Sequence, residues 1–286
     1  MSAGRVPFSV RRTSLIAGNT FLEAVRQRLF LFLVLLAVAL VLGARFFQAF
    51  HFGSDLGTAS LKFTFDFGLG ALVFFGSILT ITATAQLFFS EIENRTALTL
   101  LAKPVWRAEF IFGKFLGAWA VVGVFCALLT GLLAGLLWFR AHELLSADPE
   151  VFQHGGPVAL GDLVIVCALH WLKFGVLAMI TLLVASFSNT NLFSVVTGFF
   201  VLVICHLQGF AHQAYARVEQ SSVVLRLLIG TLARVFPDFR LFDFAEQAGQ
   251  VGGVNATLAL RAAACALIYI FVFGFLAVFS FRRREI

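Results

Sequence analysis

Six continuous apolar stretches constrain the fold of this chain more than any other feature of its sequence. They lie at residues 29–50, 67–90, 113–139, 162–187, 191–210 and 258–281. Each is close to the length of about 20 residues that an α-helix needs to cross the hydrocarbon core of a bilayer. The stretches are continuous rather than alternating, which is not the pattern of a transmembrane β-barrel. The sequence therefore predicts an all-α integral membrane protein with six transmembrane helices.

The composition agrees with residence in a membrane. Of the 286 residues, 60% are hydrophobic and 13% are charged, whereas about a quarter of the residues of a soluble domain are charged. Too little polar surface remains to cover a globule in water, which excludes a soluble enzyme and a secreted disulfide-linked module. The net charge of +6 would suggest nucleic-acid binding in a soluble protein, but in a membrane protein it marks cytoplasmic faces and contact with anionic lipid.

The positions of the Lys and Arg residues predict that both chain termini face the cytoplasm. An even number of crossings places the two termini on the same side of the membrane, and positive residues gather on the cytoplasmic side. Twelve positive residues lie before the first stretch, between the second and third, and after the last: Arg5, Arg11, Arg12, Arg26, Arg28, Arg95, Lys103, Arg107, Lys114, Arg282, Arg283 and Arg284. We therefore expect a multi-pass protein of the cell (inner, cytoplasmic) membrane.

Residues 1–28 are predicted to form a cytoplasmic segment with a helix that lies in the membrane interface. Leu15, Leu22 and Val25 recur at helical spacing, with charged residues on the other faces, as in an amphipathic interfacial helix. A cleaved signal peptide is the alternative reading of the first apolar stretch. That stretch continues well past the small residues at 37–39, which favours an uncleaved span.

Residues 211–257 form the longest segment without a predicted crossing. Within this segment the apolar run 223–236 is interrupted by two arginines and stopped by Pro237, and it is too short to cross a bilayer. We expect an outer segment with interfacial or re-entrant helices before the last span. The aromatic and charged residues that follow the run suit the headgroup layer.

Motifs for nucleotide binding and for nucleophilic catalysis are absent from the sequence. The single Gly-Lys dipeptide, Gly113-Lys114, lacks the upstream glycine of a phosphate-binding loop, and no dinucleotide fingerprint or nucleophile elbow occurs. We therefore predict no catalytic residue and no cofactor in this chain. A partner or an ion gradient must supply the energy for any work it does.

The loop at 91–112, between the second and third stretches, is the densest motif of the chain. Acidic residues at its start favour a helix N-terminus, Leu98 and Leu101 form an apolar stripe, and Pro104 ends or kinks the helix. Periodicity alone is also compatible with a loop whose long side chains reach the membrane interface.

The exact residue sequence of this loop is more specific than its hydrophobic periodicity. Glu-x-Glu-x-Arg-Thr from Glu91, then Leu-Leu-Ala-Lys-Pro-Val-x-Arg ending at Arg107, then Gly-Lys-Phe-Leu-Gly resembles the first cytoplasmic loop of ABC-2 type permeases. These are the membrane subunits of a class of ABC transporters. The aromatic-acidic residues at 236–243 and the ending Phe-Arg-Arg-Arg-Glu resemble the NosY-like branch, which is associated with multicopper-enzyme maturation.

The resemblance implies a type V exporter-like permease bundle over residues 29–286 and a coupling helix in the loop that sits in a groove of a separate ATPase. It implies ATP and Mg²⁺ in that partner rather than in this chain, and a second permease half, either a second copy or a related chain. The residues that it assigns to coupling are Glu91, Glu93, Arg95, Leu98, Leu101 and Arg107.

Polar residues inside the fourth and fifth stretches are further candidates. Lys173, with His170 about one turn before it, would line a substrate pathway or oppose an anionic substrate, unless it pairs with a carboxylate or reaches an interface. Cys167 and His170 fall at a depth similar to that of Cys205 and His206, and thiolate with imidazole suits copper or zinc. Buried cysteine is ordinarily an apolar filler, however, so we predict no metal.

Two other functions fit parts of the sequence. A membrane redox subunit could hold haem b between His170 and His206, although such subunits commonly carry repeated histidine pairs. An ion-coupled carrier could rely on Lys173, although the spans lack central acidic residues and an evident inverted repeat. The leading prediction is a non-enzymatic ABC transporter permease that works with ATPase subunits and binds no nucleic acid.

Overall fold

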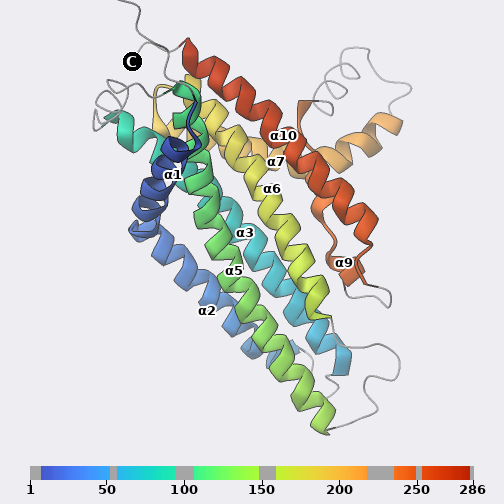
Figure 1. Ribbon diagram of the computed structural model, residues 1–286. Helices are drawn as coiled ribbons and strands as arrows, with labels where there is room; N and C mark the ends of the chain where they lie inside the picture. Colours follow the sequence, from blue (N-terminus) through green and yellow to red (C-terminus); the bar gives the residue numbers. More distant parts are fainter. Residues whose placement is uncertain are drawn as a thin grey trace, which may run out of the picture.

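The computed structural model describes residues 8–51, 57–93, 106–147, 159–217, 235–248 and 253–283. These residues form a bundle of long helices, and no strand occurs among them (Figure 1). The elements are α1 (Val10–Val25), α2 (Arg28–His51), α3 (Gly57–Glu93), α5 (Arg107–Ala147), α6 (Leu160–Phe187), α7 (Asn191–Arg217), the short helices η2 (Phe239–Phe242) and α9 (Ala245–Ala248), and α10 (Ala256–Arg282).

Five of these helices, α3, α5, α6, α7 and α10, are long and apolar enough to cross a membrane. A sixth crossing is obtained if α1 and α2, which meet at a bend of 63°, are taken together as one broken span. The prediction of an all-α membrane bundle is therefore confirmed. Most helices extend beyond the apolar stretches, because apolar residues are required only in the hydrocarbon core and a helix can continue into the headgroup layer.

Helix α6 lies at the centre of the described bundle, with neighbours on several sides. It packs against α10, α3, α5 and α7, and most of its second half is buried inside the protein. In Figure 1 it runs beside α5 and α10 along the length of the bundle. A helix that is apolar all round is expected to be covered by protein or lipid on every face.

A reciprocal pair of tryptophans joins α5 and α6. The indole nitrogen of Trp119 donates to the carbonyl of Trp171 at 3.0 Å, and that of Trp171 donates to the carbonyl of Trp119 at 3.1 Å. The two rings stack with centroids 4.3 Å apart. A Cβ atom at Gly123 or Gly175 would lie 2.9 or 2.8 Å from the facing indole nitrogen. These two glycines therefore make room for the indoles.

Helix α1 packs closely on the first part of α5. A Cβ atom at Gly113 would lie 2.7 Å from the Ile16 side chain, and one at Gly117 would lie 2.7 Å from the carbonyl oxygen of Ala17. The Gly113-x3-Gly117 pair thus allows close approach of two helices. Nothing lies within 4 Å of a Cβ atom at Gly131 or Gly135, so the second glycine pair of α5 faces away from the described residues.

The apolar stripe of α1 points away from α5. Leu15 and Leu22 are exposed on the surface of the bundle, whereas Thr13, Thr20 and Ala24 are buried. The face with small side chains therefore packs on protein, the two leucines are exposed, and Val25 packs against the core. The placement of this helix in the membrane interface stays a prediction.

The two ends of the described chain lie at the same end of the bundle, which we call the terminal end. The backbone N–H of Ser9 donates to Glu109 near the start of α5, and Arg107 donates to the last carbonyls of α10. Phe88, Phe110 and Phe281 meet there, with ring centroids 5.6 to 6.1 Å apart. The ends of α3, α5 and α10 thus share one aromatic cluster.

Candidate functional site

Two groups of polar residues stand out in the described bundle, and the first surrounds Lys114 at the terminal end. The Lys114 amino group lies 2.6 Å from Glu91 Oε1 of α3 and 3.9 Å from Glu23 Oε2 of α1. Its side chain is 1% exposed. Ser90 also donates a hydrogen bond to Glu23 at 2.8 Å. One buried cation therefore joins α1, α3 and α5, at the point where α3 leads into the loop at 91–112.

Glu109 forms a second set of charged contacts beside the first. It accepts hydrogen bonds from Arg12 Nε and Nη2 at 3.0 and 2.7 Å, and from the backbone N–H of Ser9 at 2.6 Å. It also reaches back to the backbone N–H of Trp106 at 3.1 Å, as the acidic residue of a capping box does at a helix start. Hydrogen bonding to Glu109 raises the pKa of the Arg12 guanidinium above its ordinary value.

Arg107 connects α5 with α10. Its Nη1 donates to the carbonyl oxygens of Phe281 and Arg282 at 2.9 and 2.6 Å, and its guanidinium lies 5.9 Å from the centre of the Phe281 ring. The last carbonyls of a helix lack partners within the helix, and a basic side chain can satisfy them. We call the contacts of Arg12, Glu23, Glu91, Arg107, Glu109 and Lys114 the helix junction.

The predicted coupling residues fall into two groups in the structure. Glu91 and Arg107 belong to the helix junction, where both have partners within the chain. Only the backbone of Glu93 is described, and Arg95, Leu98 and Leu101 lie outside the described residues. The role of all six in ATPase contact stays a prediction. The structure adds an intramolecular role for the two that lie nearest the ends of α3 and α5.

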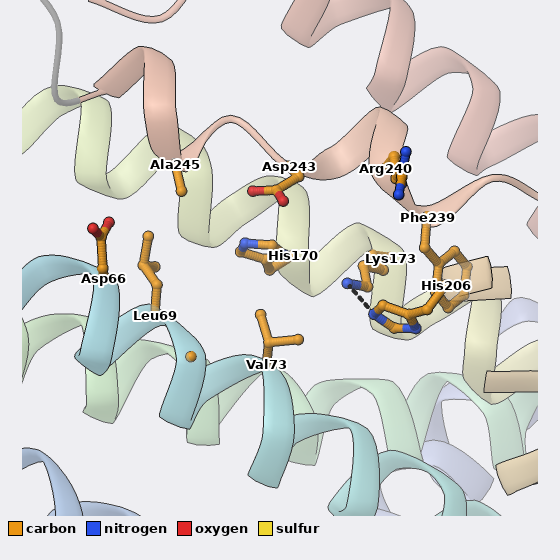
Figure 2. Close-up of a pocket in the computed structure, with 11 residues that line it drawn as sticks. Asp66, Leu69, Val73, His170, Lys173, His206, Phe239, Arg240, Asp243 and Ala245 are labelled. Carbon is orange, nitrogen blue, oxygen red and sulfur yellow. Dashed lines mark hydrogen bonds between the residues drawn. The ribbon is translucent and has the colours of Figure 1, made fainter. Parts of the chain in front are cut away.

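The second group lines a cavity in the half of the bundle away from the terminal end. The cavity, which we call the polar cavity, has a volume of about 320 Å³. Its walls come from α3, α6, α7 and the η2–α9 segment, as Figure 2 shows. The lining includes both predicted pathway residues, His170 and Lys173, together with Asp66, Leu69, Gly70, Val73, His206, Phe239, Arg240, Asp243 and Ala245.

Lys173 is held at the wall of the polar cavity by α7 and η2. Its Nζ lies 3.3 Å from His206 Nε2 and 5.3 Å from the centre of the Phe239 ring. His206 Nδ1 lies 2.9 Å from the carbonyl oxygen of Leu202, which can only accept a hydrogen bond. Nδ1 is therefore the donor, and in the neutral ring Nε2 is left to accept from Lys173. A cation over an aromatic face is further stabilised by the ring.

His170 has no such partner. It is 3% exposed, and its Nδ1 is buried without a hydrogen-bond partner among the described residues. In Figure 2 the imidazole projects from α6 into the space between Asp243 and Val73. A buried polar atom without a partner costs free energy, so this nitrogen is suited to receive a group that enters the cavity.

Asp66 and Asp243 are cavity residues that the sequence analysis did not select. Both are exposed, and neither forms an ion pair within the described part of the chain. Asp66 lies one position before the predicted span, within what proves to be helix α3. An isolated acidic residue in an apolar helix was the signal that could have identified it.

A second, apolar cavity adjoins the polar one along α3. It has a volume of about 500 Å³, and we call it the α2–α3 groove. It shares Asp66 and Gly70 with the polar cavity and is otherwise lined by Leu40, Phe63, Phe67, Ala71, Phe74 and Phe75. Nothing lies within 4 Å of a Cβ atom placed at Gly70. The two cavities therefore differ in polarity and meet at one open position.

The four predicted metal candidates do not converge. No group of three or more His, Cys, Asp or Glu residues that could hold a metal ion occurs in the described ranges. Cys167 lies beside Thr130 of α5, whereas His170 lines the polar cavity. The haem alternative gains no support either, because both ring nitrogens of His206 are engaged with Leu202 and Lys173.

Comparison with known families gives one match. A family model described as "ABC-2 family transporter protein" matches residues 14–286, which is nearly the whole chain and includes every helix described above except the first residues of α1. No curated protein with significant similarity to the chain was found. The match confirms the resemblance drawn from the loop at the level of the family, and the NosY-like branch stays a prediction.

Proposed function

The chain belongs to the ABC-2 family of transporter proteins, and from that premise we propose that it couples ATP hydrolysis by a separate ATPase subunit to the movement of a substrate. Permeases of this family are multi-pass membrane proteins that work with ABC ATPases. The family therefore accounts for the long apolar helices of the bundle and for a chain without a phosphate-binding loop.

The helix junction is the observation that carries this proposal. The loop at 94–105 leaves α3 and enters α5 directly beside the contacts of Glu91, Lys114 and Arg107. These contacts tie the ends of α3 and α5 to α1 and α10. A force applied to the loop by an ATPase would therefore reach four helices together rather than bend one connection. Packed helices joined in this way move as units.

We infer that the residues of the predicted coupling motif have two different roles. Glu91 and Arg107 hold the two ends of the loop within the bundle. In this proposal Glu93, Arg95 and the leucines at 98 and 101 supply the charged and apolar contacts with the ATPase. Both termini, and hence the terminal end of the bundle, face the cytoplasm in the cell membrane.

The polar cavity is proposed to be part of the substrate pathway. It is lined by α3 and α6, which the helix junction and central packing connect with the loop. Intramembrane polar side chains such as Lys173 and His170 commonly mark pathways. A second permease half, either another copy of this chain or a related one, completes the transporter.

A double charge reversal tests the coupling role. Tagged chain carrying Glu93→Lys with Arg95→Glu is purified from its native membrane, and we expect it to lose the co-purifying ATPase and the associated ATP hydrolysis. The matched control is Arg140→Glu with Glu143→Lys, which exchanges an ion pair of 2.7 Å near the far end of α5. Retention of ATPase by the loop variant, with hydrolysis equal to that of the control, would contradict the proposal.

A further inference from the structure

The inner wall of the polar cavity offers donors for an anionic group. Lys173 is 4% exposed and His170 is 3% exposed, so both lie deep in the cavity. Within the described residues the Lys173 amino group contacts an imidazole and a phenyl ring, and the carboxylate of Asp243 acts on it only through longer-range electrostatics. A buried cation without a carboxylate in direct contact is costly. An anion that entered the cavity would offset this cost and could also bond to the unpartnered Nδ1 of His170.

The mouth of the cavity offers the opposite charge. Asp66 and Asp243 are both exposed there, and each lies within electrostatic range of the other. Lys62, about one turn away on α3, is also within range of Asp66, and Arg240 lies on the Lys173 side of the cavity in Figure 2. Asp66 thus lies toward one end of the cavity and the amino group of Lys173 toward the other, and Asp243 is within electrostatic range of both.

The volume is sufficient for a small polar headgroup. A cavity of about 320 Å³ can hold a phosphate joined to a two-carbon amine, because it is many times the minimum that one water molecule needs.

The α2–α3 groove supplies the place for an apolar tail. It opens from the polar cavity at Asp66 and Gly70, and its other walls are aromatic and aliphatic. A methylene chain gains free energy by leaving water for such surfaces, whereas a free zwitterion gains nothing from them. A ligand that used both cavities would be amphipathic, with its headgroup beside Lys173 and its chain beside Phe67 and Phe74.

We propose that the polar cavity and the α2–α3 groove together bind a phospholipid of the phosphatidylethanolamine class. Its phosphate lies near Lys173 and His170, its ammonium group lies near Asp66 and Asp243, and one acyl chain occupies the groove. The proposal names the substrate class of the pathway and rests on the proposed function for that placement. The binding itself is a property of this chain alone and requires no ATPase.

Lipid binding by the purified full chain tests the proposal. Native mass spectrometry in detergent measures the affinity for lyso-phosphatidylethanolamine, lyso-phosphatidylglycerol and free phosphoethanolamine. We expect the first to bind at least about tenfold more tightly than either of the others, since each of them lacks one set of contacts worth about a factor of ten. Equal affinity for the two lipids, or for the lipid and the free headgroup, would overturn the proposal.

Variants assign the contacts. We expect Lys173→Met to weaken both lipids about tenfold, and Asp66→Asn with Asp243→Asn to weaken only the ethanolamine lipid, again about tenfold. Glu143→Gln is the control, because Glu143 is an exposed carboxylate near the far end of α5 that does not line the cavity and does not act on Asp66. An equal loss in the control variant would contradict the assignment of the ammonium group to Asp66 and Asp243.

A substitution at Gly70 tests the connection between the two cavities. Because open space surrounds its Cβ position, Gly70→Leu should fold and should obstruct the passage. We expect it to weaken the lipid and leave the affinity for free phosphoethanolamine unchanged. An unchanged affinity for the lipid would show that the acyl chain does not follow this route.

The same assay separates this proposal from the proposed function. The Glu93→Lys, Arg95→Glu variant should bind lyso-phosphatidylethanolamine normally even though it loses the ATPase. If the wild-type chain co-purifies with the ATPase but binds the three ligands with equal affinity, the lipid site alone is overturned. If the wild-type chain binds lyso-phosphatidylethanolamine selectively but the loop variant retains the ATPase, the coupling role alone is overturned.

Discussion

The helix junction and the polar cavity each contain a buried lysine, and the two lysines have opposite surroundings. Lys114 lies between the carboxylates of Glu91 and Glu23. Lys173 contacts His206 and the face of Phe239. The charge of the first lysine is balanced within the chain, which is what a structural contact requires. The second has no carboxylate in direct contact among the described residues, and in our proposal the phosphate of a bound lipid balances its charge. The same residue type at similar burial would then stabilise the fold in one place and bind a ligand in the other.

Removal of Lys114 should have the largest effect on stability. Lys114→Met removes the amino group that lies 2.6 Å from the buried carboxylate of Glu91, and breaking a buried ion pair from one side costs about 3–5 kcal/mol. Thermal unfolding of the purified protein in detergent measures the loss. The double variant Lys114→Met, Glu91→Leu removes both charges and should recover most of it. Failure of the second substitution to restore stability would show that the pair is not the source of the effect.

Glu109→Gln should be the next most harmful change. Each carboxylate oxygen of Glu109 accepts two hydrogen bonds, so either orientation of an amide turns its NH₂ group toward donors. A buried donor without an acceptor costs about 1–3 kcal/mol. The loss should appear in thermal unfolding and as earlier proteolysis before α5. Wild-type stability of the Glu109→Gln variant in both assays would mean that the hydrogen bonds of Glu109 do not add to the stability of the helix junction.

The two glycine pairs of α5 should respond with opposite signs. At Gly117 an added methyl group would lie 2.7 Å from a backbone carbonyl of α1, and overpacking costs about 1–3 kcal/mol. Alanine also favours a helix by about 0.5–1 kcal/mol, so we expect Gly117→Ala to destabilise by about 1 kcal/mol. Gly135→Ala meets no atom and should stabilise slightly. Equal melting temperatures for the two variants would argue against the close packing of α1.

Lys173→Met should have the smallest effect on stability. It removes one hydrogen bond, worth about 1 kcal/mol, and at the same time removes a buried charge that has no carboxylate in direct contact. We expect a net change within about 1 kcal/mol, measured in lipid-free detergent beside Lys114→Met. A loss as large as that of Lys114→Met would abolish the distinction between the two lysines.

The arrangement of long helices could be predicted from sequence because hydrophobicity alone specifies a crossing. Helices α5, α6 and α10 contain the predicted stretches 113–139, 162–187 and 258–281. A helix before the first stretch was also predictable, because the apolar residues of α1 recur at helical spacing; its interfacial location stays a prediction. In each case the signal is local, and the neighbours of the helix do not alter it.

The contacts between helices could not be predicted in the same way. The two glycine pairs of α5 have the same spacing in the sequence, and only the position of α1 distinguishes Gly113 from Gly131. Sequence reasoning assigned Glu91 to a partner protein, whereas Lys114, 23 positions later, supplies an intramolecular partner. It paired His170 with His206, but in the structure the Nε2 atom of His206 lies 3.3 Å from Lys173. Such pairings depend on how each helix is rotated about its own axis, and the length of its apolar stretch does not specify that rotation.

The stacked Trp119 and Trp171 give the molecule a natural optical probe. Two indoles with centroids 4.3 Å apart interact electronically, and their near-ultraviolet circular dichroism and fluorescence depend steeply on that separation. The chain contains four tryptophans, so Trp106→Phe and Trp138→Phe would leave this pair alone. Since the pair bridges α5, which the loop enters, and α6, which lines the polar cavity, its spectrum would report any sliding of these helices during a transport cycle without an added label.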